Sequence, residues 1–406
     1  MREARLGDFL APRSRGIVPN VTPETTFELY SVPSFERRQP EVVKGAAIGS
    51  NKQIVAPGTV LLCKINPRIN RAWVVGAFSS HQKIASTEWI TFPPSDQLQP
   101  KYLAYFLSKN SVRGHLAANA SGVGGSLMRV KASTVKDVTF PLPPLAAQVE
   151  IVAEIDKQFS RLDEAVATLQ RVKANVKRYK AAVLKAAIER QLVESPTTEP
   201  WNVMALARAS EVQLGQQRAP VHAAATEQVP YVRAANVTWE GLDLTDVKTM
   251  GFPNPDRYRL RVGDVLLAEA SGSASEVGKP SMWNGEIPGA CYQKTLIRIR
   301  PKPDMLLPRF VYYVFLHTSL SGQFARLAPG VGILHLTAER MLEWPIAIPP
   351  LGEQQEIVAE VDHRLSIVRE VEAEVDANLK RAQALRQSIL SAAFAMRGPR
   401  ETMNAL

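Results

Sequence analysis

The stretch PPLAAQVEIVAEID at residues 143–156 recurs as PPLGEQQEIVAEVD at residues 349–362. The copies start 206 residues apart (349 − 143) in a chain of 406, and the register continues without a gap to Leu184 opposite Leu390. A repeat of this kind is the first thing to establish about a sequence, because it means that one half of the chain is built like the other.

Each copy predicts one long helix. Paired prolines suit a first helical turn, whose N–H groups have no partner there. Between Pro144 and Pro196 there is no proline or glycine, and apolar residues recur three and four positions apart. A helix of about 45 residues is roughly 65 Å long, and its narrow apolar stripe needs a partner. We expect the two helices to pack on each other as an antiparallel coiled coil; the alternative is that each packs on its own neighbouring domain.

The segments before each helix also align. VAPGTVLLCKINPR at 55–68 lies opposite LRVGDVLLAEASGS at 260–273, and PKYLAYFLSKNSVRGHL at 100–116 lies opposite PRFVYYVFLHTSLSGQF at 308–324. Short apolar runs bounded by turn residues predict strands, and proline-initiated runs with helical spacing predict short helices. The predicted strands are 58–62, 73–78, 89–92, 263–267 and 295–300, and the predicted short helices are 100–107 and 308–316.

The chain is therefore expected to be an α+β protein with an internal pseudo-twofold repeat. We divide it into a first α+β domain at 1–142, a central spacer helix at 143–195, a second α+β domain at 196–348, a C-terminal spacer helix at 349–396 and a tail at 397–406 that we expect to be disordered.

Charge is concentrated in the first domain. Residues 1–144 hold 18 Lys/Arg and 9 Asp/Glu, a balance of +9, whereas residues 196–350 hold 15 and 14, a balance of +1. A positive domain attracts polyanions such as DNA. The chain has no signal-peptide pattern and no apolar run long enough to cross a membrane, so we expect a cytoplasmic protein.

No catalytic or metal-binding pattern is present. The six histidines have no metal-ligand spacing, and the two cysteines, Cys63 and Cys291, are isolated. The chain has no phosphate-binding loop, no dinucleotide fingerprint, no nucleophile elbow and no adenine-methyltransferase motif. We therefore expect a binding subunit, with no metal or cofactor on this chain.

The twin motifs PLPPLAAQVEIV at 141–152 and AIPPLGEQQEIV at 347–358 resemble the specificity subunit of type I restriction-modification systems. The resemblance covers essentially the whole chain. It implies two tandem target recognition domains, at 1–142 and 196–348, each reading one half of a split, asymmetric target in double-stranded DNA. It implies that the coiled coil sets the gap between the half-sites.

The resemblance also implies partners that carry out the chemistry. Two copies of an adenine methyltransferase subunit would bring S-adenosylmethionine, and a restriction and translocase subunit would bring ATP and magnesium. We expect the partner contacts to involve the repeat motif, through Leu145, Gln148, Ile151, Leu351, Gln354 and Ile357.

Polar residues on the variable loops are the predicted DNA contacts, because Arg, Lys, Asn, Gln and Ser are the usual readers of base edges. In the first domain they are Lys64, Asn66, Arg68, Asn70, Arg71, His81, Lys83, Arg129 and Lys131, and in the second they are Ser271, Ser273, Lys279, Gln293, Lys294 and His335.

Three alternatives remain open from the sequence. The chain could serve a related system that cuts on both sides of a split site, with nuclease and methylase fused in the partner. It could be a single-chain nuclease or methylase, which the absent motifs disfavour. It could be an architectural DNA-binding protein without an enzymatic partner.

Overall fold

The computed structural model describes residues 2–12, 15–69, 71–122, 128–194, 199–223, 225–271, 273, 276–327 and 334–395. The chain forms two compact units, unit 1 with Met1–Gln170 and Asp376–Leu406, and unit 2 with Arg171–Val375. Each unit contains one α+β domain and a part of both long helices. The tail predicted at 397–406 lies outside the described residues.

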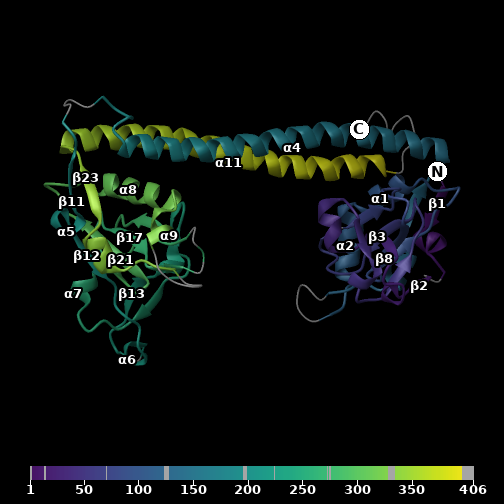
Figure 1. The fold of residues 1–406 in the computed structure, drawn as a ribbon, viewed down its shortest axis with the longest axis horizontal. Coiled ribbons are helices and arrows are strands. Elements are labelled where there is room, and N and C mark those ends of the chain that lie inside the picture. The colour runs from purple at the N-terminus through teal and green to yellow at the C-terminus, as the bar shows by residue number, and fades with distance from the viewer. Residues whose placement is uncertain are drawn as a thin grey trace. The chain divides into compact units, whose positions relative to one another are not determined.

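The two long helices are α4 (Leu145–Ile188, 44 residues) and α11 (Leu351–Ala393, 43 residues). They are shorter than the predicted 143–195 and 349–396, and each begins directly after its proline pair. In unit 1, the Arg386 side chain of α11 pairs with Asp163 of α4, and its guanidinium lies 4.2 Å from the centre of the Phe159 ring. Earlier α4 residues share a core with residues 389–394, and later ones line a groove with residues 378–385, so the helices run antiparallel in this unit (Figure 1).

Both long helices also pack on the α+β domains. In unit 1, Ile155 of α4 is fully buried in the same core as Leu103 and Phe140 of the domain. In unit 2, Leu184 of α4 and Val361 of α11 share a core with the domain. Within unit 1 the long helices therefore contact each other, and in both units they also pack on the neighbouring domain. Val149 and Tyr179 of α4 are about half exposed.

The domain of unit 1 has one small, one five-stranded and one three-stranded sheet. Their strand orders are β1-β10, β2-β5-β8-β3-β4 and β7-β6-β9. Helix α1 lies between the long helices and the sheet that contains β3 and β8 (Figure 1). The strands are β1 (Arg2–Arg5), β2 (Gly16–Ile17), β3 (Thr26–Tyr30), β4 (Glu41–Lys44), β5 (Lys52–Ile54), β6 (Val60–Cys63), β7 (Ala72–Val74), β8 (Gln82–Ser86), β9 (Trp89–Phe92) and β10 (Thr139–Leu142), and the helices are α1 (Pro100–Leu107), α2 (Asn110–Ala118) and α3 (Ala132–Lys136).

The domain of unit 2 is built around the sheet β12-β21-β17-β19, with smaller sheets β11-β23, β16-β13-β20, β14-β15 and β18-β22. The strands are β11 (Asn202–Ala205), β12 (Ser210–Leu214), β13 (Val229–Val232), β14 (Val237–Thr238), β15 (Gly241–Leu242), β16 (Lys248–Met250), β17 (Val265–Ala268), β18 (Ala270–Ser271), β19 (Pro280–Met282), β20 (Cys291–Tyr292), β21 (Leu296–Pro301), β22 (Leu334–His335) and β23 (Pro345–Ile348). The helices are α5 (Leu206–Ala209), α6 (Pro220–Ala223), α7 (Pro255–Tyr258), α8 (Pro308–Leu320), α9 (Gln323–Leu327) and α10 (Ala338–Leu342).

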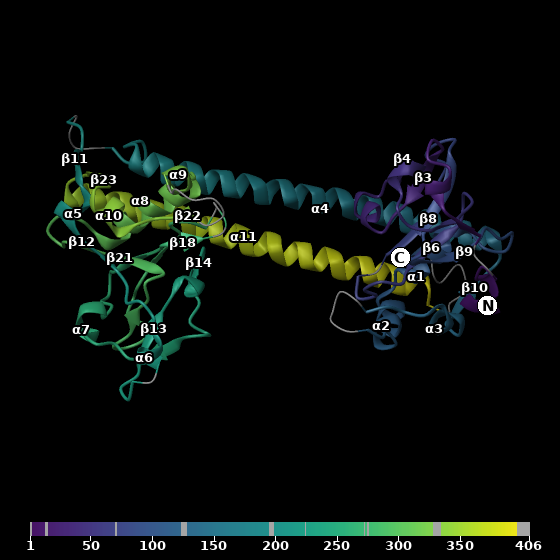
Figure 2. The same ribbon diagram turned by 60° about the horizontal axis from the view of Figure 1, so that its bottom comes forward.

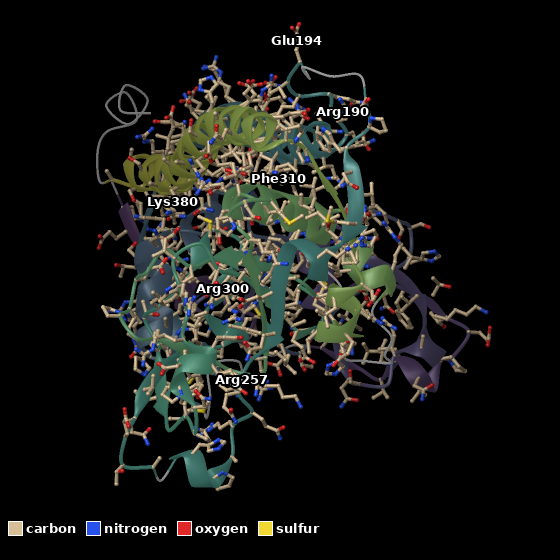
Figure 3. The ribbon with its side chains drawn as sticks, turned by 90° about the vertical axis from the view of Figure 1, so that its left-hand side faces the viewer. Arg190, Glu194, Arg257, Arg300, Phe310 and Lys380 are labelled. Carbon is tan, nitrogen blue, oxygen red and sulfur yellow. The ribbon has the colours of Figure 1, made fainter. Side chains whose placement is uncertain are left out.

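Within unit 2 the elements are layered away from the long helices. Helix α8 lies next to α11, and the small sheet with β13 lies at the opposite end, beside α6 (Figure 2). Phe310 of α8 lies directly under the long helix, Arg300 of β21 lies deeper, and Arg257 of α7 lies toward the end with α6 (Figure 3). Phe310 is 1% exposed and packs edge-on against Trp201, with 6.3 Å between the ring centres.

The two domains have the same central arrangement of strands and differ in the elements added to it. In both, the first strand pairs antiparallel with the strand before the long helix, β1 with β10 and β11 with β23. In both, a buried strand with the sequence Val-Leu-Leu, β6 or β17, pairs antiparallel with β9 or β21. The additions differ, because unit 1 carries the five-stranded sheet and unit 2 carries the sheet β16-β13-β20.

A buried glutamine fixes each long helix to its domain. Gln148 is fully buried, and its amide accepts a hydrogen bond from the Gln99 N–H (2.9 Å) and donates to the carbonyls of Gln97 and Pro143 (both 2.9 Å). Gln354 makes the same three bonds in unit 2. The side-chain amide thus satisfies backbone groups that burial would otherwise leave without a partner.

The repeated aspartates hold the same junction about two turns later in each helix. Asp156 accepts from Lys101 (2.8 Å) and Tyr105 of α1. Asp362 accepts from Arg309 (3.0 Å) and Tyr313 of α8. Both halves therefore have the same contact between the long and the short helix. An aspartate on the long helix accepts from two donors that lie four residues apart on the short helix.

Candidate nucleic-acid interface

Three chain segments meet where β6 leaves the shared core of unit 1. The Lys64 N–H donates to the Glu88 carbonyl (2.9 Å), and the Val130 N–H donates to the Lys64 carbonyl (3.0 Å). The Asn66 N–H donates to the Met128 carbonyl (2.8 Å). We call residues 64–69, 71, 87–88 and 128–131 the strand-exit site of unit 1. It brings Lys64, Asn66 and Arg129 together although they are far apart in the sequence.

Several cations of this site face solvent. Arg129 pairs with Glu88 (3.1 Å) while its side chain remains 55% exposed. The ammonium of Lys64 donates to the Thr87 carbonyl (2.6 Å). Arg68 and Lys131 are exposed and have no ion pair among the described residues. Exposed cations around a loop can bind phosphates or base edges.

Two other predicted residues of this loop, Arg71 and Asn66, have structural roles in the domain. Arg71 pairs with Glu36 (3.0 Å), and only 13% of its side chain is exposed. Asn66 has a φ of 45°, in the left-handed region that asparagine tolerates better than most residues, and this turns the chain out of the strand. Asn70 lies outside the described residues.

Unit 2 has an equivalent strand-exit site, residues 269–271, 293–295 and 334–337. The Glu269 N–H donates to the Thr295 carbonyl (2.9 Å), and the Leu336 N–H donates to the Glu269 carbonyl (2.7 Å). β18 pairs with β22, and Ala270 is opposite His335. The Nδ1 atom of His335 lies 3.2 Å from a carboxylate oxygen of Glu269.

The two strand-exit sites have one backbone register and different chemistry. The bridge Ile65–Arg129 in unit 1 corresponds to the pair Ala270–His335 in unit 2. In unit 1 the basic side chain is that of Arg129, and its acidic partner, Glu88, comes from the neighbouring segment. In unit 2 the basic side chain is that of His335, and its acidic partner, Glu269, occupies the position that corresponds to Lys64. A shared frame therefore presents different donors and acceptors in the two units.

The remaining predicted residues of unit 2 divide by exposure. Lys294 is exposed, and its ammonium lies 3.5 Å from the Gln217 amide oxygen. Gln293 is half-buried, and its backbone forms a parallel β-bridge with Gln216. Ser273 is exposed. The backbone of Ser271 lies in β18, and its side chain is outside the described part of the chain.

Lys279 is held inside the domain. Its ammonium pairs with Glu276 and lies 5.7 Å from the centre of the Trp239 ring, and only 13% of its side chain is exposed. The hydrogen bond from Lys279 lowers the pKa of Glu276, and the Trp239 indole donates to the same carboxylate. This arrangement favours a structural role for Lys279.

The structure separates His81 and Lys83 from the strand-exit site. His81 is exposed just before β8, whereas Glu88 lies beyond the other end of that strand. Lys83 is 9% exposed and pairs with the fully buried Glu28 (3.3 Å). Burial would raise the pKa of Glu28, but hydrogen bonds from Ser79, Tyr30 and Lys83 lower it. The Lys83 ammonium therefore neutralises a buried carboxylate and is not presented to solvent.

The contacts predicted for partner subunits need a correction. Gln148, Gln354, Ile151 and Ile357 are 0–4% exposed, because they anchor the long helices to this chain's own domains. Buried side chains cannot contact a partner in this conformation. Of the six predicted residues, Leu145 is 45% exposed and Leu351 is partly exposed.

Sequence reasoning missed one exposed loop of unit 2. Gln217 and Arg218 are exposed residues after β12, and the Gln217 side chain contacts Lys294. A basic residue beside two glutamines after a strand was the available signal. Among the described residues, no group of three or more His, Cys, Asp or Glu side chains could hold a metal ion. In the same part of the chain, no helix is both long and apolar enough to cross a membrane.

Comparison with known proteins gives one family. A family profile described as "Type I restriction modification DNA specificity domain" matches residues 12–178 and 216–376. The StySPI type I restriction enzyme specificity subunit of Salmonella potsdam is 25% identical over 320 residues, 74% of this chain and 66% of that protein. The EcoKI specificity subunit of Escherichia coli (strain K12) is 24% identical over 301 residues, 72% and 64%. The matches thus span slightly less than two thirds of these relatives.

Solved structures show the same fold. A chain from a structural study of complex assembly and conformational transition in the type I R-M system has a TM-score of 0.77, with 20% identity and 97% of both chains covered. The HsdS subunit from Thermoanaerobacter tengcongensis has a TM-score of 0.55, with 20% identity and 97% and 96% covered.

Proposed function

Since this chain belongs to the type I restriction modification DNA specificity family, we propose that it is the subunit that gives a restriction-modification complex its DNA address. It reads double-stranded DNA, carries out no chemistry itself and works in the cytoplasm. Adenine methylation comes from two copies of a methyltransferase subunit that brings S-adenosylmethionine. Cleavage and translocation come from a restriction subunit that brings ATP and magnesium.

The observation that carries the proposal is the pair of strand-exit sites. One backbone frame occurs twice, and it presents Lys64, Glu88 and Arg129 in unit 1 but Glu269, Thr295 and His335 in unit 2. Two readers with one frame and different side chains would recognise two different short sequences. The target would therefore be bipartite and asymmetric.

Charge supports a division of labour between the domains. The excess of +9 in residues 1–144 favours phosphate binding, which supplies most sequence-independent affinity for DNA. Residues 196–350 carry only +1 and would depend more on local contacts such as Lys294 and Arg218. At the strand-exit sites, Arg68, Arg129 and Lys131 are the residues of unit 1 that we assign to DNA, and Lys294 and His335 those of unit 2.

The long helices would serve as spacer and docking surface. We assign them to a coiled coil whose length fixes the gap between half-sites. Exposed apolar residues on these helices are candidates for contact with the methyltransferase subunits, namely Leu145, Val149, Tyr179, Ile367, Val371 and Leu385. Exposed apolar side chains are common singly, but a series on two helices favours a protein partner.

The test is an adenine-methylation map of the host genome with and without this gene, by modification-sensitive long-read sequencing. We expect methylated adenines in one split, asymmetric motif to disappear on deletion. If the motif persists and the purified chain does not bind the neighbouring methyltransferase subunit, the proposal is wrong. Retained binding with no methylated motif in either strain would instead point to an inactive methyltransferase.

A further inference from the structure

A pocket of about 400 Å³ adjoins the strand-exit site of unit 1. It is lined by the strand-exit residues Ile65 and Glu88 and by Gly49 and Ser50. Lys52 of β5 also lines the pocket. Whatever lies against the strand-exit site can therefore extend into this pocket.

Lys52 is a buried cation that lacks an opposite charge. It is 7% exposed, and its ammonium donates to the carbonyl (2.9 Å) and the hydroxyl (2.5 Å) of Ser50. Among the described residues it forms no ion pair, and burial lowers its pKa. An ammonium has three N–H donors, and both of these acceptors belong to one serine. Lys52 therefore has donor capacity and positive charge left for a ligand.

The two carboxylates of the pocket are already compensated. Glu41 accepts from Arg37 (2.9 Å), and Glu88 accepts from Arg129 (3.1 Å). The uncompensated charge among the described lining residues is thus the ammonium of Lys52. Burying a charge without a partner costs free energy, so the fold alone gives no reason for a lysine at this position.

The remaining lining suits an oxyanion attached to an apolar group. Ser31, Ser50 and Ser86 bring hydroxyl groups, which can donate to phosphate oxygens. Leu29 and Val43 bring apolar walls that can accept a sugar ring. A base edge is a poorer candidate, because it lies inside a groove of the duplex and a recessed pocket cannot reach it, whereas backbone phosphates project outward.

We propose that this pocket binds one phosphate of the DNA backbone, with Lys52 as its cation, and so positions unit 1 over its half-site. The proposal rests on the proposed function and deepens it. Phosphate contacts fix register without carrying sequence information. A partly desolvated ammonium makes a short, strong bond to such an oxyanion. Lys52 is a positioning residue here, and the strand-exit residues remain the candidates for reading bases.

The experiment measures binding of the full chain to duplex DNA over a range of KCl concentrations. One phosphate contact contributes about 0.9 to the slope of log K against log salt. We expect Lys52→Met to lower that slope by about this amount, so that affinity falls about 3.5-fold less between roughly 50 and 200 mM salt. The loss should be equal for target and non-target duplexes. Lys44→Met on β4, an exposed lysine paired with Glu24, is the control with the same charge change.

A second variant protects the test against a folding defect. Gly49 lines the pocket, and a Cβ atom there would meet no atom within 4 Å, so the backbone has room for a side chain. Gly49→Leu therefore adds bulk at the pocket. We expect it to lower the slope as Lys52→Met does. Thermal unfolding of each variant shows whether it is folded, and removal of an uncompensated buried charge should not lower the melting temperature.

Inorganic phosphate gives a readout that does not need DNA recognition. Added phosphate should raise the melting temperature of the wild type more than that of Lys52→Met, because ligands stabilise the state that binds them. This difference would support the pocket even if no methylated motif were found, which separates its failure from that of the proposed function. Equal effects of phosphate would overturn the pocket. Phosphate binding with an unchanged salt slope would overturn its assignment to the DNA backbone.

Discussion

The fully buried Gln354 allows a sharp prediction about the joint between α11 and unit 2. Replacement by alanine removes the acceptor of the Leu307 N–H (2.8 Å) and the donor to the carbonyls of Met305 (2.9 Å) and Pro349 (2.8 Å). At roughly 1 kcal/mol for each hydrogen bond, the loss is about 3 kcal/mol. For a unit of this size, that lowers the melting temperature by roughly 6–12 °C.

Thermal unfolding followed by circular dichroism measures the loss, and hydrogen exchange locates it. The Leu307 amide should lose protection in Gln354→Ala, because its acceptor is gone. The matched control is Gln355→Ala, which changes the same residue type one position later, at an exposed site. It should change stability by no more than about 0.5 kcal/mol. Gln148→Ala should repeat the effect in unit 1. Equal melting temperatures for the Gln354 and Gln355 variants would refute the anchoring role.

Three further predictions concern the buried acid, the DNA interface and the spacer. Because the pKa of Glu28 is lowered, its carboxylate stabilises unit 1 above pH 4.5, and this stabilisation is lost as pH falls through the folded-state pKa. The fall of unfolding free energy with decreasing pH should therefore be shallower in Glu28→Gln. It should be unchanged in the exposed control Glu24→Gln. Arg129→Gln should lower the salt slope of DNA binding by about 0.9 if Arg129 contacts a phosphate, whereas relaxed sequence preference at one base of the half-site would identify it as a base reader. The third change inserts one helical turn into both α4 and α11, at the boundaries between the units, 170/171 and 375/376. The insertion adds about 5.4 Å and should lengthen the gap in the methylated motif by one or two base pairs. Altered half-sites would contradict a rigid spacer.

The long helices and the shared core could be predicted because their signals are local. α1 has the bounds predicted, 100–107, and β9 has the predicted bounds 89–92. Proline starts, uninterrupted apolar spacing and short β-branched runs fix these elements without information from elsewhere in the chain. The repeat then showed which of them correspond.

The five-stranded sheet of unit 1 was not predicted. Its strands are two to five residues long, and β3 (Thr26–Tyr30) places a charged glutamate in a fully buried position. Glu28 can be buried because Lys83 and Ser79 reach it from a distant segment and Tyr30 donates to it from the same strand. Tertiary context of this kind overrides local propensity and leaves no periodic trace in the sequence.

The candidate site was predicted in part. Loop position made Lys64, Arg68 and Arg129 candidates, but the register that joins the strand exit to residues 128–131 depends on long-range pairing. Sequence similarity also marked Gln148 and Gln354 without their role. A repeated polar residue can be retained for a partner or for an internal anchor, and burial alone distinguishes the two.

The central claim is that one frame, used twice, reads two different half-sites. The direct measurement replaces residues 202–348 by a second copy of residues 2–142, since β1 and β11 begin, and β10 and β23 end, at equivalent positions. The methylated motif of cells carrying this chain and its methyltransferase is then sequenced. We expect a split motif whose two halves carry the same bases, those of the first half-site. A motif that retains the original second half-site would contradict it.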